Sequence, residues 1–284
     1  MPITTTAHLL SAAAARGVGV GAFNIITLEH AEAIIAGAEA AGRPVILQLS
    51  QNAVRFHGGA VRPIAAAMGA MAEAAVVPVA LHLDHVEDDE LLHRAADAGF
   101  RSVMFDAGRL AYAPNVAATA AAAEWAHANG LSIEAELGYV GGKETQVSSA
   151  HEPGVRTDPD QAAEFVAATG VDALAVAVGS SHAMTSRSAA LDDALIERLR
   201  DAVPVPLVLH GSSGVPDDEL SRAVTAGIVK VNIGTILNVA FTGAVRRTLG
   251  ELSSVDPRKY LAPARQAMTE TVLHLLGVVD PPAT

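Results

Sequence analysis

Eight short apolar segments recur along the chain, and a segment of helical length separates each from the next. They are residues 18–25, 44–50, 77–85, 102–108, 131–138, 173–182, 205–214 and 227–235. Because a strand that is apolar at nearly every position is buried on both faces, these segments favour a parallel sheet covered by helices. Eight strand–helix units predict an α/β fold of the (β/α)8 TIM-barrel type, with an open doubly wound sheet as the alternative.

The intervening segments carry helix signals. Residues 28–42, LEHAEAIIAGAEAAG, and residues 88–99, DDELLHRAADAG, space their apolar residues at the helical period and end on Gly, a frequent helix stop. A further helix is expected in the tail beyond about residue 250. No low-complexity linker divides the chain, so residues 1–284 are expected to form a single domain.

Composition narrows the functional classes. The formal net charge of -12 argues against a general binder of nucleic acid or of anionic membranes, although a few local donors could still hold an anionic substrate. There is no basic, apolar leader at the N-terminus and no apolar run of membrane-spanning length, so a cytoplasmic protein is expected. Because the chain has no cysteine, any metal ligands must be His, Asp or Glu.

Polar residues stand at or just beyond the carboxyl end of every predicted strand. In a barrel of this kind the carboxyl ends of the strands form the rim on which active sites are built. The sequence therefore predicts an active site at this rim. The polar rim residues are Asn24, Ser50, Asp84, His85, Asp106, Glu134, Glu136, His182, His210 and Asn232.

Three of these rim residues are histidines that come from different strands. His85, His182 and His210 follow the third, sixth and seventh strands. Three converging imidazoles with one open position are typical of a catalytic Zn2+ site, whereas neutral hydrogen-bonding histidines are the alternative. Surface positions are expected for the remaining histidines outside the strands: His8, His30, His57, His93, His127, His151 and His274.

The third strand leaves the choice of its metal ligand open. Alternate side chains of a strand face opposite ways, so His82 and Asp84 share a face and His85 points to the other. Parity alone favours His82 as the ligand. His85 reaches the same cavity only if the strand ends or twists at that point.

Two turns rich in Gly and Ser follow the last two strands. They are HGSSG at 210–214 and NIGT at 232–235, and the second leads into an apparent helix. Loops after strands seven and eight, together with a helix N-terminus, form the usual phosphate site of such barrels. Backbone amides and hydroxyls are expected to bind an anion at Gly211, Ser212, Ser213, Gly234 and Thr235.

Several ordered motifs resemble one family, the class II, metal-dependent ketose-bisphosphate aldolases. The motifs are AFNI, LHLDH, EAELGYVGGKE, AVGSSH, LVLHGSSGVPDDEL, KVNIGT and DPRKYLAPAR, and they run from near residue 20 to near residue 265. The resemblance implies zinc-dependent, reversible cleavage of a ketose 1,6-bisphosphate, foremost fructose 1,6-bisphosphate, to dihydroxyacetone phosphate and glyceraldehyde 3-phosphate. A tagatose-bisphosphate or other phosphorylated-ketose aldolase is the alternative. A homodimer or homotetramer is also implied.

The resemblance also implies roles for individual residues. Asp84 matches the acid/base that acts on the substrate hydroxyl, and His85 matches the first zinc ligand, with His182 and His210 as the other two. Carboxylates at Asp106 and Glu136 match an alternative metal position. Glu144 matches a loop glutamate that exchanges a proton with carbon, and Asn232 matches a residue that supports the enediolate.

Substrate contacts follow from the same resemblance, together with departures from the family pattern. Arg258 resembles an arginine that reaches the far phosphate across a dimer interface. Ala183 stands where Gly is usual and could alter a contact to phosphate or to a monovalent cation, Arg187 could replace a family lysine, and Thr145 stands where Asp is frequent. The remaining substrate contacts implied are Asn24, Ser50, Gly211, Ser212, Ser213, Asn232, Ile233, Gly234 and Thr235.

Other functions remain as alternatives. A Schiff-base aldolase needs a lysine inside the barrel, and of Lys143, Lys230 and Lys259 only Lys230 lies on a predicted strand, before the rim. A metal-dependent hydrolase with a similar barrel usually has His-x-His on its first strand, which is absent from VGVGAFNI. A barrel that binds metal or sugar phosphate without catalysis is the third alternative.

Overall fold

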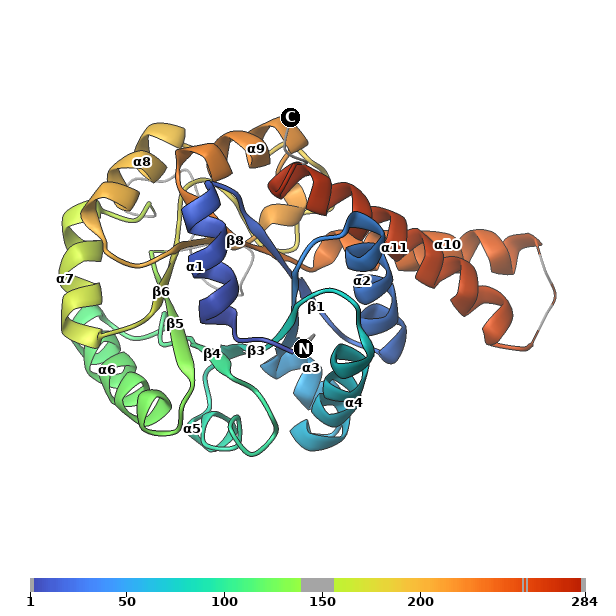
Figure 1. Ribbon diagram of the computed structural model, residues 1–284, viewed down its shortest axis with the longest axis horizontal. Helices are drawn as coiled ribbons and strands as arrows, with labels where there is room; N and C mark the ends of the chain where they lie inside the picture. The colour runs from blue at the N-terminus through green and yellow to red at the C-terminus, as the bar shows by residue number, and fades with distance from the viewer. Residues whose placement is uncertain (1–2, 139–155, 252, 254, 282–284) are drawn as a thin grey trace.

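Eight parallel strands close into a barrel in chain order, and helices surround it (Figure 1). The computed structural model describes residues 3–138, 156–251, 253 and 255–281. The strands are β1 (Val20–Asn24), β2 (Val45–Ser50), β3 (Val79–Val86), β4 (Ser102–Phe105), β5 (Ser132–Leu137), β6 (Ala173–Val176), β7 (Leu207–Leu209) and β8 (Ile228–Ile233). The predicted TIM barrel is confirmed, and the open-sheet alternative is wrong because β1 pairs with β8.

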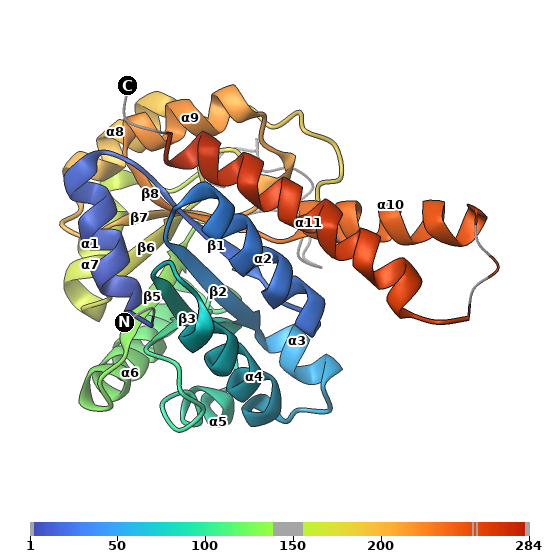
Figure 2. The same ribbon diagram turned by 45° about the vertical axis from the view of Figure 1, so that its right-hand side comes forward.

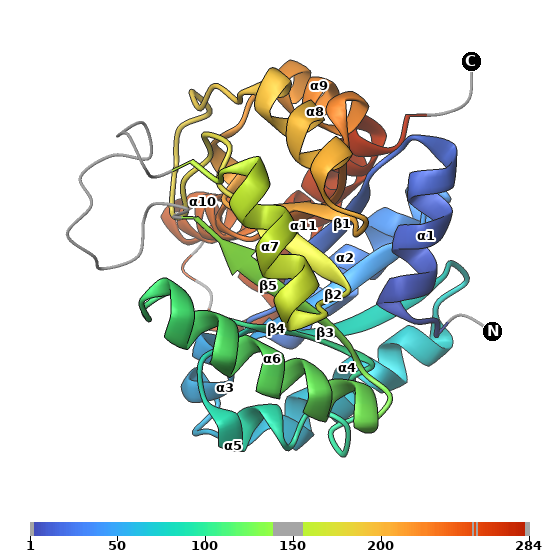
Figure 3. The same cartoon turned by 90° about the vertical axis from the view of Figure 1, so that its left-hand side faces the viewer.

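Helices follow the strands around the outside of the barrel, as a side view shows (Figure 3). They are α1 (Thr6–Arg16), α2 (Leu28–Ala41), α3 (Gln51–Phe56), α4 (Val61–Ala74), α5 (Asp89–Leu92), α6 (Tyr112–Ala128), α7 (Pro159–Thr169), α8 (Asp193–Ala202), the 3-10 turn η1 (Ser212–Gly214), α9 (Asp217–Ala226), α10 (Thr235–Glu251) and α11 (Arg258–Val279). Within the described residues, no helix has both the length and the apolar character needed to cross a membrane.

The barrel closes at its amino end around α1. Leu9, Leu10 and Ala13 of this helix pack with small or aliphatic side chains inside the barrel, among them Ala22 and Val208. A separate and larger apolar cluster lies between the outer faces of the strands and the surrounding helices. Helix α1 therefore fills part of the barrel interior at the amino ends of the strands.

Several predicted boundaries were too long. The sixth and seventh strands were predicted at 173–182 and 205–214. They form strand pairs only over Ala173–Val176 and Leu207–Leu209, and the chain beyond each strand forms a rim loop. The helix predicted at 88–99 is regular only over Asp89–Leu92. Beyond it the backbone closes tighter turns, because Arg94 and Ala95 donate to carbonyls three residues back.

Among the described histidines expected at the surface, His30 is buried, and His151 lies outside the described residues. His30 of α2 is 3% exposed, and its ring stacks on Phe241 of α10 with 5.6 Å between the ring centroids. The His30 Nδ1 accepts a hydrogen bond from the Thr27 backbone amide and completes a cap of α2. The surface prediction for His30 was wrong because α10 covers this part of α2, and burial lowers the pKa of His30.

Helix α11 confirms the expected helical tail, and α10 and α11 project beyond the barrel as a pair (Figure 2). The second half of α11 packs over α2, and the two helix backbones approach closely there. A Cβ added at Gly37 of α2 would lie 2.7 Å from Cγ1 of Val272 on α11. Glycine at residue 37 therefore permits the contact that anchors the projecting pair to the barrel.

Candidate functional site

A cavity of about 620 Å³ opens at the carboxyl ends of the strands. Its lining comes from loops that follow separate strands, as the rim hypothesis requires. A second cavity, of about 740 Å³, lies beside α1 at the opposite end of the barrel and lacks the imidazole cluster. The predicted residues that line the rim cavity are Asn24, Ser50, Asp84, His85, Asp106, His182, Ala183, Gly211, Ser213, Asn232, Gly234 and Thr235.

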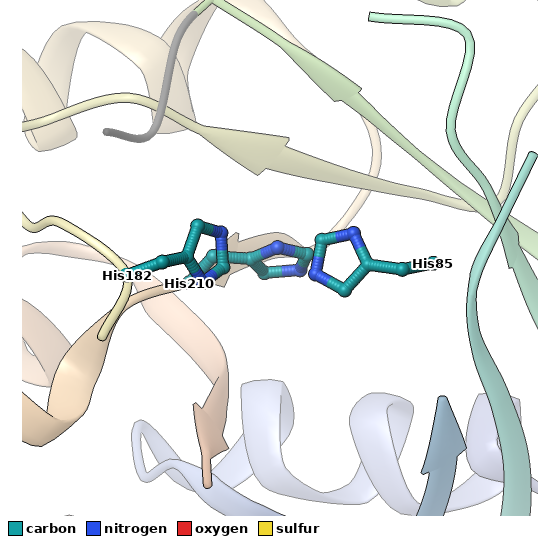
Figure 4. Close-up of side chains that lie close together, drawn as sticks. All are labelled: His85, His182 and His210. Carbon is teal, nitrogen blue, oxygen red and sulfur yellow. The ribbon is translucent and has the colours of Figure 1, made fainter. Parts of the chain in front are cut away.

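Three imidazoles converge at the floor of this cavity (Figure 4). One ring nitrogen from each of His85, His182 and His210 lies within 4.8 Å of those of the other two. The ring centroids are 4.9 Å apart for His85 and His210 and 5.3 Å apart for His85 and His182. Three nitrogen donors at this spacing, from three separate segments of the chain, match the ligand set of a catalytic divalent-metal site.

The backbone of β3 explains why His85 joins the cluster. The pairing of β3 with β4 is regular to Leu83 and shifts by one residue before Val86, which is a β-bulge. His85 lies in this bulge with φ 49, in the left-handed region that non-glycine residues seldom adopt. The bulge turns His85 toward the rim, so strand parity, which favoured His82, does not apply here.

Carboxylates stand beside two of the imidazoles. His85 Nδ1 lies 3.0 Å from Asp106 Oδ2, and His210 Nδ1 lies 3.1 Å from Glu136 Oε2. Both carboxylates are buried, at 7% and 6% exposure. A buried set of imidazoles and carboxylates fits a divalent cation, because the cation would compensate charge that apolar surroundings do not.

A polar layer lies inside the barrel below the imidazoles. Glu134 Oε1 is 2.9 Å from His210 Nε2, and Lys230 Nζ donates to Glu134 Oε2 over 2.7 Å. Burial alone would raise the pKa of Glu134, but Lys230 and the hydrogen bond from His210 outweigh it and hold that pKa below its usual range. Lys230 is fully buried and paired, so the structure offers no support for a Schiff base at this lysine.

His82 belongs to the same interior layer. Its Nδ1 lies 2.8 Å from Ser102 Oγ, and the residue is 1% exposed. Burial is the largest cause of its lowered pKa, about 3, with the charge of Lys230 acting in the same direction. His82 is therefore neutral and supports the barrel interior.

His210 carries a perturbed pKa because two carboxylates flank its ring. Burial by itself lowers the pKa of His210, but hydrogen bonds with Glu134 and Glu136 overcome it and raise the pKa to about 9. A cation bound at this imidazole would have to displace that proton.

Asp84 is held by one oxygen and open at the other. Asn24 Nδ2 donates to Asp84 Oδ2 over 2.8 Å, while Asp84 Oδ1 is buried without a hydrogen-bond partner among the described residues. Burial would raise the pKa of Asp84, but the nearby His85 and Lys230 lower it to about 2. The cavity thus contains an ionised carboxylate with an unused acceptor, which can take a proton from a bound hydroxyl.

The Gly- and Ser-rich turns lie on one side of the cavity. A Cβ at Gly211, which has φ 67, would lie 2.7 Å from the Ser181 carbonyl oxygen, so this turn requires glycine. Ser213 Oγ accepts from the Ile236 backbone amide in the first turn of α10. Gly234 and Thr235 line the cavity where α10 begins, and an anion there would meet the positive end of the helix.

Two predicted contacts of this anion site do not face the cavity with their side chains. The Ser212 hydroxyl donates to the Asn232 carbonyl, and Ile233 is 1% exposed. Asn232 itself lines the cavity, and its buried Oδ1 has no hydrogen-bond partner within the described part of the chain. Asn232 therefore places its side-chain amide at the cavity, whereas Ser212 and Ile233 stabilise the turns.

The two predicted arginines lie away from the cavity. Arg187 donates to the Val215 carbonyl over 2.9 Å and 2.6 Å and pairs with Asp217, so its guanidinium is already engaged. Arg258 is the first residue of α11, its side chain is 87% exposed, and it pairs with Asp256. The structure does not bring Arg187 or Arg258 to the cavity of their own chain.

Ala183 adopts an unusual backbone conformation beside His182. Its φ of 59 is in the left-handed region, where glycine avoids a steric penalty. This explains why glycine is usual at this position. The loop residues Glu144, Thr145 and Lys143 lie outside the described residues.

Sequence reasoning missed part of the cavity lining. These polar residues follow β2, β3 and β4 or begin α10, and the rim rule could have found them had it been extended past each strand end. The missed residues are Gln51, Asn52, Arg55, Glu87, Arg109 and Asn238.

Comparisons with known proteins identify a family and relatives over nearly the whole chain. The family model described as fructose-bisphosphate aldolase class-II matches residues 4–280. The chain is 42% identical over 275 residues to a fructose-bisphosphate aldolase of Geobacillus stearothermophilus, covering 96% of this chain and 95% of the relative. It is 39% identical over 304 residues to the fructose-bisphosphate aldolase of Thermus caldophilus, covering 98% and 99%. The crystal structure of the YdjI aldolase from Escherichia coli K12 superposes with a TM-score of 0.85 at 33% identity, covering 98% of each chain.

Proposed function

Because this chain belongs to the class II fructose-bisphosphate aldolase family and is an aldolase, we propose that it cleaves fructose 1,6-bisphosphate reversibly with zinc as its metal. The products are dihydroxyacetone phosphate and glyceraldehyde 3-phosphate. The observation that carries the proposal is the convergence of three imidazole nitrogens within 4.8 Å, beside an ionised carboxylate with a free acceptor.

The imidazoles His85, His182 and His210 would hold the cation, and Asp106 and Glu136 would offer it an alternative position. When bound, the cation supplies Lewis-acid stabilisation of the negative charge that develops on the carbonyl oxygen of the ketose. Three imidazole ligands suit zinc.

Asp84 is the base for the cleavage direction. The substrate hydroxyl donates its proton to Asp84 Oδ1 as the carbon–carbon bond breaks, while Asn24 keeps Oδ2 in place. Asn232 contributes polar support to the carbanion fragment through its cavity-lining amide. Glu144 is proposed to return a proton to carbon in that fragment.

The triose-phosphate end of the substrate is assigned to the turns after β7 and β8. Backbone amides at Gly211 and Gly234, with the Ser213 and Thr235 hydroxyls and the amino end of α10, suit a phosphate dianion without any cationic side chain. A monovalent cation near Ala183 is a further candidate component of this subsite. Asn24 and Ser50 line the cavity at the ends of β1 and β2 and are proposed to contact the rest of the sugar.

A homodimer or homotetramer is proposed from the projecting pair of helices. Val239 and Leu249 of α10 are 47% and 48% exposed, and Arg258 begins α11 at the far end of the pair (Figure 1). Arg258 does not line the cavity of its own chain, so its proposed contact is with the substrate of another copy. We therefore assign the far phosphate of the substrate to Arg258 of a neighbouring subunit. We also propose that the enzyme is cytoplasmic.

The identity of the ketose substrate can be tested by running the reaction in the condensation direction. Purified protein is incubated with dihydroxyacetone phosphate and a panel of aldehydes, and the stereochemistry of each product is determined. Preference for glyceraldehyde 3-phosphate with fructose configuration supports the proposal. A product of tagatose configuration would instead favour the alternative, a tagatose-bisphosphate aldolase, since the two sugars are epimers.

A further inference from the structure

A buried ion pair lies inside the barrel directly below the imidazole cluster. Lys230 and Glu134 are 0% and 3% exposed, and Lys230 Nζ is 2.7 Å from Glu134 Oε2. Removing both charges from water costs free energy that their attraction often fails to recover. A contribution to fold stability is therefore a weak explanation for placing this pair in the barrel.

The second oxygen of the same carboxylate has another partner. Glu134 Oε1 lies 2.9 Å from Nε2 of His210. The carboxylate of Glu134 on β5 therefore links Lys230 on β8 to the imidazole after β7. His210 is fully buried, so its ring has no water to bond with at Nε2. Since a carboxylate only accepts hydrogen bonds, Nε2 must carry the proton that the contact uses.

The other nitrogen of this ring faces the opposite way. His210 Nδ1 lies 3.1 Å from Glu136 Oε2 at the cluster side. An imidazole whose Nε2 carries a proton has its lone pair on Nδ1, so the contact with Glu134 selects the nitrogen that is presented to a cation.

We propose that Glu134 and Lys230 are positioning residues for metal binding: Glu134 fixes the ring orientation and tautomer of His210 by accepting from Nε2, and Lys230 fixes the Glu134 carboxylate. This inference rests on the proposed function, because it presumes that His210 ligates a cation. Neither residue lines the rim cavity, and neither touches substrate.

Two double variants separate positioning from a structural role. Glu134→Leu with Lys230→Met removes both charges and the acceptor, while Glu134→Gln with Lys230→Met removes both charges and keeps an amide oxygen for His210. Neither variant leaves an unpaired buried charge, so both are expected to fold. His82→Asn is the matched control, since it changes a buried polar side chain of the same layer whose printed hydrogen bond goes to Ser102 instead.

Zinc affinity is measured by competition with a chromophoric chelator, and the visible spectrum of the Co2+-substituted proteins reports the ligand geometry. Melting curves of the metal-free proteins report folding. We expect the Leu/Met variant to bind zinc about 10- to 100-fold more weakly than wild type, with an altered Co2+ spectrum. The Gln/Met variant is expected within about fivefold of wild type, because a neutral acceptor replaces a charged one. His82→Asn should match wild type.

Equal zinc affinity in wild type and the Leu/Met variant would overturn the inference. Equal weakening in the two double variants would also overturn it, since the acceptor would then have no specific effect. Failure of the wild-type protein to bind zinc is a different result, because it would overturn the proposed function itself.

Discussion

Asn24 and Asp84 are joined by a hydrogen bond of 2.8 Å that spans from the end of β1 to the end of β3. The bond engages Oδ2, and Oδ1 has no hydrogen-bond partner among the residues that the structure describes. One amide thereby sets the orientation of the proposed base.

Asp84→Asn is expected to keep its metal and lose turnover, because the amide cannot accept the hydroxyl proton. The expected fall in kcat is about 10²- to 10⁴-fold, the usual contribution of a general base. Steady-state kinetics and metal analysis on the same preparation check this. If Asp84→Asn lost its metal to the same degree as a histidine variant, the separation of roles would be contradicted.

Asn24→Ala tests the orienting bond itself. Loss of a hydrogen bond to a charged group costs about 1.5–3 kcal/mol. If the bond acts mainly in the transition state, kcat should fall about 10- to 100-fold with metal content unchanged. Unchanged kcat in Asn24→Ala would show that Asp84 is held adequately by other contacts.

Removing a single imidazole from the cluster should remove the metal. His182→Ala and His210→Ala are expected to be isolated with little zinc, because two remaining nitrogens bind a cation weakly. His8→Ala, at an exposed position on α1, is the control and should retain wild-type zinc. Elemental analysis after gel filtration is the measurement, and full zinc content in His182→Ala would remove that residue from the ligand set.

Buried His82 should make the metal-free protein less stable in mild acid. Its pKa falls from 6.5 to about 3 on folding, so between these values the unfolded chain binds a proton that the folded chain does not. Stability therefore falls as the pH drops below about 6.5, by up to about 1.4 kcal/mol per pH unit. His82→Asn should flatten this dependence in urea denaturation between pH 6.5 and 4.5. An unchanged slope in the variant would contradict the assignment.

Ala183→Gly should stabilise the fold by up to about 1 kcal/mol, because Ala183 has φ 59 and glycine adopts that conformation without steric cost. Ala167→Gly, at an exposed position within α7, is the control and should destabilise by about 0.5–1 kcal/mol. Thermal melting of both variants gives the comparison. Equal destabilisation by the two substitutions would contradict the strained conformation at residue 183.

The alternation of apolar runs and helical segments predicted the barrel, because burial on both faces leaves a plain sequence signal. Strand lengths at β6 and β7 were overestimated, since the apolar run continues into the loop after each strand. His30 was misplaced because its cover, Phe241, is distant in sequence. A contact between residues that are far apart in the sequence leaves no pattern in the sequence around either residue.

The candidate site was predictable as a set of rim residues, but its internal geometry was not. A β-bulge at His85 cannot be read from strand parity, which favoured His82. The engagement of Arg187 with the Val215 carbonyl and Asp217 likewise depends on how two loops pack. Sequence spacing fixes which residues reach the rim, whereas loop packing decides where each side chain points.

The central claim is that a cation held by three histidines is required for cleavage of fructose 1,6-bisphosphate. The direct measurement is dihydroxyacetone phosphate release by protein dialysed against EDTA, before and after addition of one equivalent of zinc. The account predicts no cleavage by the metal-free protein, recovery with zinc, and no inactivation by borohydride in the presence of substrate. Full activity in protein shown by elemental analysis to be free of metal would contradict it.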